Sequence, residues 1–138
     1  MKGLIIALQF LTRLPMPGVP VDSASFAASM RWFPVAGLAV GGAVAGAFWL
    51  GGRIDPWLGA FAGLVLWVWI TGALHLDGLS DLADARGATH RDPERLLAVM
   101  ADPHVGSFGV VTLVVQLIAK LVLLHLLPPE QWPALLLI

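Results

Sequence analysis

Cysteine and tyrosine are absent from this sequence of 138 residues, and only 12% of the residues are charged. Without cysteine, the chain has no disulfide, no thiolate metal site and no cysteine nucleophile. Soluble domains carry about 25% charged residues, so this chain has too few polar groups to cover a surface in water. Its 8 basic and 9 acidic side chains leave no basic excess to neutralise phosphates, which argues against nucleic acid as a partner.

Hydrophobic residues make up 58% of the sequence, and its mean hydropathy is +0.84. A disordered chain has the opposite composition. Two segments of 21 residues each contain no Asp, Glu, Lys or Arg, and about 20 apolar residues let a helix cross a bilayer. We therefore predict an all-α, polytopic helical bundle in the lipid bilayer, with about three transmembrane helices at about residues 34–52, 57–76 and 105–127. Lys120 interrupts the third, where it either snorkels toward the interface or faces the bundle interior.

The two ends of the chain differ from these spans. The apolar run 3–11 is too short to cross a bilayer, and prolines follow it instead of a cleavage site for a signal peptide. We interpret this run as an interfacial or re-entrant segment. The last residues, PPEQWPALLLI, have the pattern of a further apolar segment that has just begun. The sequence therefore predicts a single membrane domain over 1–138 that is truncated at its C-terminus.

Small residues recur four positions apart in the first two predicted spans. The glycine pairs are Gly37 and Gly41, Gly42 and Gly46, and Gly59 and Gly63. This spacing either lets helix backbones approach closely or reflects how common glycine is in membrane helices. Because the link between the two spans, residues 51–56, is short, we expect them to form an antiparallel hairpin.

Basic residues indicate the orientation in the membrane. Six of the seven that flank the first two spans fall on the side of the N-terminus, and only Arg53 lies in the turn between the spans. The positive-inside rule then places the N-terminus and the polar loop 77–104 in the cytoplasm.

This polar loop holds most of the groups that can do chemistry, since nine of the 17 charged residues lie between Asp77 and Asp102. If the second helix continues to Arg86 and stops at Gly87, three aspartates lie within about 60° on one helix face. Carboxylates this close repel one another unless a divalent cation lies among them, and Mg²⁺ prefers such oxygen ligands. We therefore predict a Mg²⁺ site formed by Asp77, Asp81 and Asp84.

Alternatives exist for these groups. The aspartates would otherwise form a solvated acidic helix end, but the helix dipole disfavours acids near a C-terminus, and ionisable clusters at a membrane are usually functional. His75 lies roughly opposite Asp77 on the helical wheel. It is a base or ligand only if the backbone bends, for example at Gly78, and is otherwise structural.

Further polar residues are candidates for binding phosphate. Arg91 and Arg95 lie one helical turn apart, so they either hold phosphate oxygens or face anionic lipid. Gly106 and Ser107 lead into the third span, and the free backbone N–H groups of a helix N-terminus bind phosphate well.

Four motifs together resemble the cobalamin synthase family, the adenosylcobinamide-GDP ribazoletransferases. They are FLTRLP, FPVAGLAVGG, LHLDGLSDLADARG and DPHVGSFGVVTLVVQLIAK, in this order from about Phe10 to Lys120. The LHLDGLSDLAD block is the most specific of them. Family members are nearly twice as long, with several further spans, and they usually have Asp-Ser-Arg where this chain has Asp102-Pro103-His104.

The resemblance implies a Mg²⁺-dependent, multi-pass transferase of the bacterial cytoplasmic (inner) membrane, with its active-site loop facing the cytoplasm. It implies that α-ribazole or its 5′-phosphate is joined to adenosylcobinamide-GDP and that GMP is released. The product would be adenosylcobalamin or its 5′-phosphate, made in a late step of cobalamin biosynthesis. Partners would be a second copy of the chain or other membrane enzymes of the corrinoid pathway.

In such a phosphoryl-type transfer, positioning and charge neutralisation carry most of the catalysis. We expect Asp81 or His75 to accept the proton of the attacking hydroxyl. The residues expected to bind substrate are Arg13, Arg91, Arg95, Asp102, Gly106 and Ser107.

Two other functions fit parts of the sequence. An enzyme like the CDP-alcohol phosphotransferases would also be a helical membrane bundle with an aspartate cluster, but Arg91 stands where its signature needs a further aspartate, and it would release CMP. A non-catalytic membrane subunit or fragment is the second alternative. Changing Asp81 to alanine would then leave the activity of the pathway intact.

Overall fold

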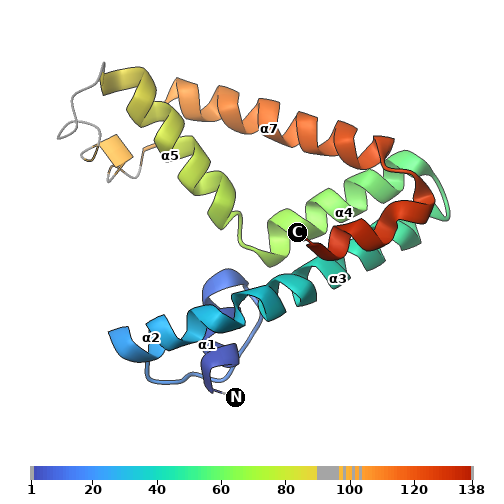
Figure 1. The fold of residues 1–138 in the computed structure, drawn as a ribbon. Coiled ribbons are helices and arrows are strands. Elements are labelled where there is room, and N and C mark those ends of the chain that lie inside the picture. The colour runs from blue at the N-terminus through green and yellow to red at the C-terminus, as the bar shows by residue number, and fades with distance from the viewer. Residues whose placement is uncertain (1, 90–96, 98, 101, 103, 138) are drawn as a thin grey trace. The chain divides into compact units, whose positions relative to one another are not determined.

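The computed structural model describes residues 2–89, 97, 99, 100, 102 and 104–137, and all regular structure in them is helical (Figure 1). In chain order the elements are α1 (Lys2–Leu11), α2 (Ser23–Ser29), the 3-10 helix η1 (Met30–Trp32), α3 (Phe33–Gly52), α4 (Pro56–Ile70), α5 (Leu74–Thr89), α7 (Ser107–Leu126) and the 3-10 helix η2 (Pro129–Leu137). The all-α prediction is confirmed. The chain forms two compact units, Met1–Gly72 with Leu121–Ile138, and Ala73–Lys120.

The first unit is built around the hairpin of α3 and α4. Asp55 starts α4, because its carboxylate accepts the backbone N–H groups of Trp57 and Leu58 at 2.8 and 3.1 Å. Pro56 is the first residue of that helix and needs no N–H partner there. The expected hairpin is therefore present, and its core consists of Val40, Val44 and Ile70, with Ala43 and Trp67 packed against them.

Glycine lets the two helices of this hairpin touch. A Cβ atom on Gly59 would lie within 3 Å of backbone atoms of Phe48 and Gly52, and one on Gly63 would press against Phe48. Gly46, by contrast, has open space at the same position. Close helix packing therefore explains Gly59 and Gly63, whereas it does not explain Gly46.

Two shorter segments of the first unit pack against α3. One is α1, which also contacts α2; Asp22 and Ser25 cap the start of α2 reciprocally. The other is η2, whose backbone at Leu135 and Leu136 lies directly against Gly41. The expected short N-terminal helix is thus present as α1. Its place at the membrane interface, the further span at the C-terminus and the single domain over 1–138 stay predictions.

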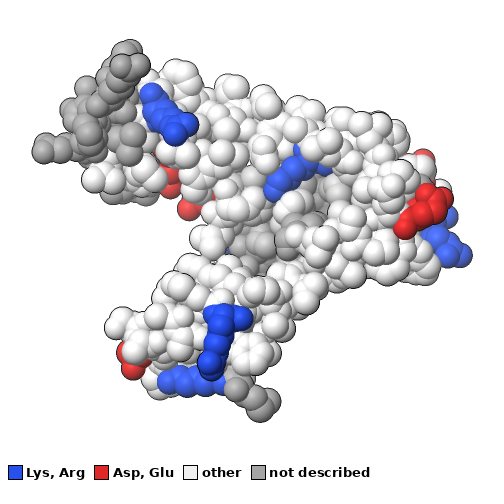
Figure 2. Space-filling model, in the orientation of Figure 1, with Lys and Arg blue, Asp and Glu red and all other residues white. Residues whose placement is uncertain are grey.

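Long apolar helices confirm the membrane class. Two helical segments of the described chain are long and apolar enough to cross a bilayer, Ser23–Gly52 and α7, or three if the broken pair α4 and α5 is one span. α7 exposes large apolar side chains, among them Val111 at 62% and Leu123 at 67%. Figure 2 shows that most of the visible described surface carries no charge. Such a surface is expected where lipid replaces water.

The second predicted span is interrupted after Ile70. Residues 71–73 form a turn in which Gly72 and Ala73 have positive φ angles of 62° and 61°. Glycine adopts such an angle readily, but alanine does so at a cost. The backbone N–H of Arg13 binds the carbonyl of Ile70 at 2.8 Å, so a distant segment satisfies the acceptor that the end of α4 leaves free.

The expected course of the helix beyond this span is therefore wrong. It does not continue unbroken from the span to Arg86, and it does not stop at Gly87, because α5 begins anew at Leu74 and continues to Thr89. Asp77 consequently lies in the first turn of α5, where the helix dipole favours a carboxylate. The argument that the dipole disfavours these acids does not hold for Asp77.

Candidate active site

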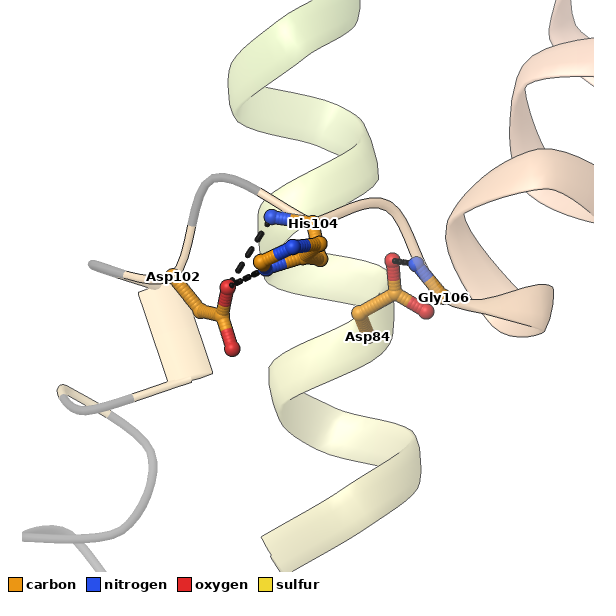
Figure 3. Close-up of polar contacts among 4 residues, drawn as sticks. All are labelled: Asp84, Asp102, His104 and Gly106. Carbon is orange, nitrogen blue, oxygen red and sulfur yellow. Dashed lines mark hydrogen bonds and ion pairs between the residues drawn. The ribbon is translucent and has the colours of Figure 1, made fainter.

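The second unit joins α5 to the start of α7 through the side chain of Asp84 (Figure 3). Its Oδ2 accepts the backbone N–H of Gly106 and its Oδ1 that of Gly109, both at 2.8 Å. The side chain is buried, with 9% of its surface exposed. The first N–H groups of a helix lack partners within the helix. Asp84 therefore caps α7 from another helix, and its charge suits the positive end of the helix dipole.

This junction has no room for additional side-chain atoms. A Cβ atom on Gly106 would collide with the carboxylate of Asp84, and one on Gly109 would collide with both Asp84 and the hydroxyl of Ser80. A Cβ atom on Gly87 would likewise collide with the ring of Phe108 on α7. The contact between α5 and α7 thus depends on glycine on both helices. The Oγ atom of Ser80 is buried there and has no hydrogen-bond partner among the described residues.

The other two predicted metal ligands lie nearer the N-terminus of α5. Asp77 is exposed and Asp81 is half-buried. Within the described ranges, no three histidine or acidic side chains form a group that could hold a metal. The structure therefore does not assemble the three aspartates into one site, and Asp84 has both oxygens engaged elsewhere. Mg²⁺ commonly takes only one or two protein carboxylates together with substrate phosphates, a requirement that Asp77 and Asp81 satisfy by residue type.

His75 contacts a lysine of α7. The Nζ atom of Lys120 lies 2.9 Å from Nε2 of His75. A lysine ammonium can only donate a hydrogen bond, so Nε2 accepts it and a neutral ring carries its proton on Nδ1. This contact turns the amine of Lys120 toward α5, at an exposed position. The chain bends before His75, at residues 71–73, rather than at Gly78.

Asp102 and His104 form a local turn before α7 (Figure 3). Oδ1 of Asp102 accepts the backbone N–H of His104 at 3.0 Å and lies 2.6 Å from Nδ1 of its ring. Both contacts lower the pKa of the Asp102 carboxyl below its ordinary value, and the backbone N–H of His104 has the larger effect. The carboxylate is exposed. Its role in binding substrate stays a prediction.

The remaining predicted substrate-binding residues belong to different parts of the sequence. Arg13 belongs to the first unit, where its side chain packs over Gly72. Ser107 is the exposed first residue of α7. Arg91 and Arg95 lie outside the described residues. Within the second unit, the structure places Gly106 and Ser107 with Asp84, at the start of α7.

A separate cavity of about 530 Å³ lies in the first unit. Its walls are largely aromatic and apolar, including Trp49, Trp132 and His125, and Arg53 and Glu130 also line it. The ring of His125 stacks on Trp57 with centroids 3.8 Å apart. The cavity contains a single carboxylate, from Glu130, so it does not offer the paired acids that the predicted chemistry needs.

Comparison with known proteins identifies the family. The family model for cobalamin-5-phosphate synthase matches residues 3–138. The chain belongs to this family. It is 67% identical over 131 residues to the adenosylcobinamide-GDP ribazoletransferase of Novosphingobium aromaticivorans, covering 92% of this chain and 53% of that protein. It is 63% identical over 141 residues to the enzyme of the same name from Thiobacillus denitrificans, covering 100% of this chain and 57% of that protein.

The resemblance predicted from the motifs is thus confirmed for the cobalamin-5-phosphate synthase family. The chain spans about half the length of the curated relatives it matches. No solved structure matches it.

Sequence reasoning missed two residues that the structure places in contact with predicted site residues. The sequence shows Gly109 only as one residue of the motif DPHVGSFGVVTLVVQLIAK, although its N–H binds Asp84. Lys120 was noted as an interruption of a span, without its partner His75. In both cases the sequence shows only a small or a polar residue within an otherwise apolar segment. The pairing itself depends on how two helices meet.

Proposed function

We propose that the chain forms part of an adenosylcobinamide-GDP ribazoletransferase, which joins α-ribazole or its 5′-phosphate to adenosylcobinamide-GDP and releases GMP. Two relatives with that name are 67% and 63% identical to it. The structural observation that carries the proposal is the acidic helix α5 and its contact with the start of α7. The carboxylates of Asp77 and Asp81 on this helix accept no hydrogen bond from the described residues, whereas Asp84 of the same helix binds the glycine-rich start of α7.

The proposed reaction is a phosphoryl-type transfer. The ribazole hydroxyl attacks the phosphorus that carries the cobinamide arm, a new P–O bond forms, and the bond from that phosphorus to GMP breaks. The hydroxyl proton passes to Asp81 or to His75. His75 accepts it only when Lys120 releases Nε2, because that atom is engaged in this structure. Asp81 is therefore the better candidate for the base.

The negative charge that develops on GMP as it leaves must be neutralised. The chain offers carboxylates that could hold a cation and arginines that could bind phosphate directly. When bound, Mg²⁺ would offset the negative charge of the leaving phosphate, and Asp77 and Asp81 are the residues we propose to hold it. The cationic side chains of Arg13, Arg91 and Arg95 are proposed to bind substrate phosphates, as arginine does through paired N–H groups. The backbone N–H of Ser107 is a further candidate, and Asp102 completes the proposed substrate-binding set.

The proposed location is the bacterial cytoplasmic membrane, with residues 77–104 facing the cytoplasm. The long apolar helices of the described chain support the membrane, and the distribution of basic residues supports this orientation.

GMP release tests this function. The purified, detergent-solubilised chain receives adenosylcobinamide-GDP and α-ribazole with and without Mg²⁺, beside the variants Asp81→Ala and, as a matched acidic control, Glu130→Gln. We expect Mg²⁺-dependent GMP release that Asp81→Ala reduces at least about a hundredfold and that Glu130→Gln leaves unchanged.

Because the chain covers about half of its relatives, the same assay is repeated on the sequence extended through its genomic reading frame. Silence of this longer chain as well, or full activity of its Asp81→Ala variant, would overturn the proposal. Release of CMP from a CDP-alcohol substrate would instead support the phosphotransferase alternative.

A further inference from the structure

We infer that Asp84 is a positioning residue, which holds the start of α7 against α5, and that it is not a ligand of the cation. Asp77 and Asp81 are then the only aspartates of α5 left for Mg²⁺. The statement about Asp77 and Asp81 rests on the proposed function. The statement about Asp84 does not, because it follows from contacts within the second unit.

The hydrogen bonds of Asp84 carry the first argument. Each carboxylate oxygen accepts one backbone N–H at 2.8 Å, from Gly106 and Gly109. Both bonds are charge-assisted and therefore among the stronger kinds in proteins. Gly109 is buried, so its N–H would lose its acceptor in the interior of the unit if Asp84 turned to a cation. A buried donor without a partner is costly, and none of the described carboxylates other than Asp84 is bonded to it.

The lack of space carries the second argument. Even a single carbon atom added to Gly106 or Gly109 would collide with the carboxylate of Asp84. Mg²⁺ needs near-octahedral coordination and usually keeps several of its waters. No such group fits between Asp84 and the backbone of α7. Asp77 is exposed and Asp81 half-buried, so both can reach a hydrated ion.

The cap that Asp84 forms lies next to the residues proposed to bind substrate. Gly106 and Ser107 are the residues expected to meet a substrate phosphate, and Asp84 fixes the backbone of Gly106 directly. Asp81 lies about one helical turn before Asp84 on α5. By holding α7 at this point, Asp84 sets the distance between the carboxylate of Asp81 and the start of α7 without touching the reacting atoms.

Two measurements on the purified chain in detergent test the inference, and neither needs turnover. The first is hydrogen exchange of the backbone N–H groups in residues 105–110. The second is the binding of Mn²⁺, used as a spectroscopic substitute for Mg²⁺ and followed by electron paramagnetic resonance. The variants are Asp84→Asn, Asp81→Asn as the matched control on the same helix, and Gly109→Ala, which breaks the same junction from α7.

We expect Asp84→Asn and Gly109→Ala to speed exchange in residues 105–110 by about tenfold or more and to change Mn²⁺ affinity by less than about threefold. Asp81→Asn should do the opposite, with unchanged exchange and at least about tenfold weaker Mn²⁺ binding. Loss of helical structure in both junction variants, with Asp81→Asn still folded, would also support the positioning role.

Unchanged exchange in Asp84→Asn would overturn the inference. A loss of Mn²⁺ binding as large as that in Asp81→Asn would also overturn it, if Asp84→Asn keeps the helical structure of the parent chain. If the parent chain bound no Mn²⁺, the cation of the proposed function would be contradicted. The exchange measurement would still decide the role of Asp84.

Discussion

The two units of this chain join their helices by different means. In the first unit, α3 and α4 meet through glycine and small apolar residues, with Gly59 against the backbone of Gly52. In the second unit, α5 and α7 also approach closely at glycines, but polar contacts join them as well, from Asp84 to Gly106 and Gly109 and from Lys120 to His75. Close packing of small residues can hold two helices together without hydrogen bonds between their side chains. The polar contacts of the second unit are specific to a few atoms, so single substitutions are expected to affect the two units in different ways.

The largest effect is expected where the packing of the first unit is broken. Gly59→Leu places a side chain where even a Cβ atom lies within 3 Å of the backbone of α3. We expect the free energy of unfolding to fall by about 3 kcal/mol, measured by thermal or denaturant unfolding in detergent. Gly46→Ala is the control, because its site is open and alanine favours a helix, so stability should rise by up to about 1 kcal/mol. Equal losses in both variants would show that glycine acts here through backbone flexibility and not through packing.

A smaller effect of opposite sign is expected at the polar junction of the second unit. Ser80 buries a hydroxyl that has no partner among the described residues. Ser80→Ala removes that hydroxyl and should raise the free energy of unfolding by about 1 kcal/mol. Ser107→Ala, at an exposed position, should change it by less than about 0.5 kcal/mol. A destabilised Ser80→Ala variant would mean that the hydroxyl has a partner in the folded protein.

The turn between α4 and α5 should respond more weakly still. Ala73 has a φ angle of 61°, which costs an L-residue about 1 to 2 kcal/mol. Glycine at this position would remove that strain, but it would also lose more backbone entropy on folding, which offsets part of the stabilisation. We expect Ala73→Gly to stabilise the chain by about 0.5 kcal/mol in the same unfolding experiment. Ala83→Gly, in the middle of α5, should instead destabilise by about 1 kcal/mol. If both lose stability alike, the backbone at residue 73 is not strained.

The smallest effect is expected from pH at Asp102. Its contacts with His104 lower the pKa of the carboxyl, so the folded chain binds this proton less readily than the unfolded chain does. The resulting stability is present above the ordinary aspartate pKa of about 3.9 and is lost as the pH falls through the lower, folded value. The contribution is small, since the group is exposed. Melting temperatures of the parent and Asp102→Asn should differ at pH 6 and converge as the pH falls through the lowered pKa of the folded chain; a constant difference would contradict this assignment.

Local properties of the sequence predicted much of the fold. The spans predicted at 34–52 and 105–127 correspond to α3 and α7, because the length of an apolar run is visible residue by residue. The break after Ile70 was not predictable in this way, since it involves a hydrogen bond from Arg13, far away in the chain.

The site was predictable as a set of residues but not as an arrangement. The aspartates of α5 stand out by composition, and a helical wheel predicts that they lie near one face. The wheel treats them as equivalent, whereas Asp84 differs from the other two because of glycines that lie 22 and 25 residues further on. Only the way in which α5 meets α7 separates a buried capping carboxylate from its more exposed neighbours.

The bond between Arg13 and Ile70 also bears on how the chain is made. Synthesis runs from the N-terminus, so the segment that carries Arg13 leaves the ribosome well before α4 does. When Ile70 emerges, the donor for its carbonyl is already present. The end of α4 can therefore be completed during translation, without any contribution from the helices that follow it.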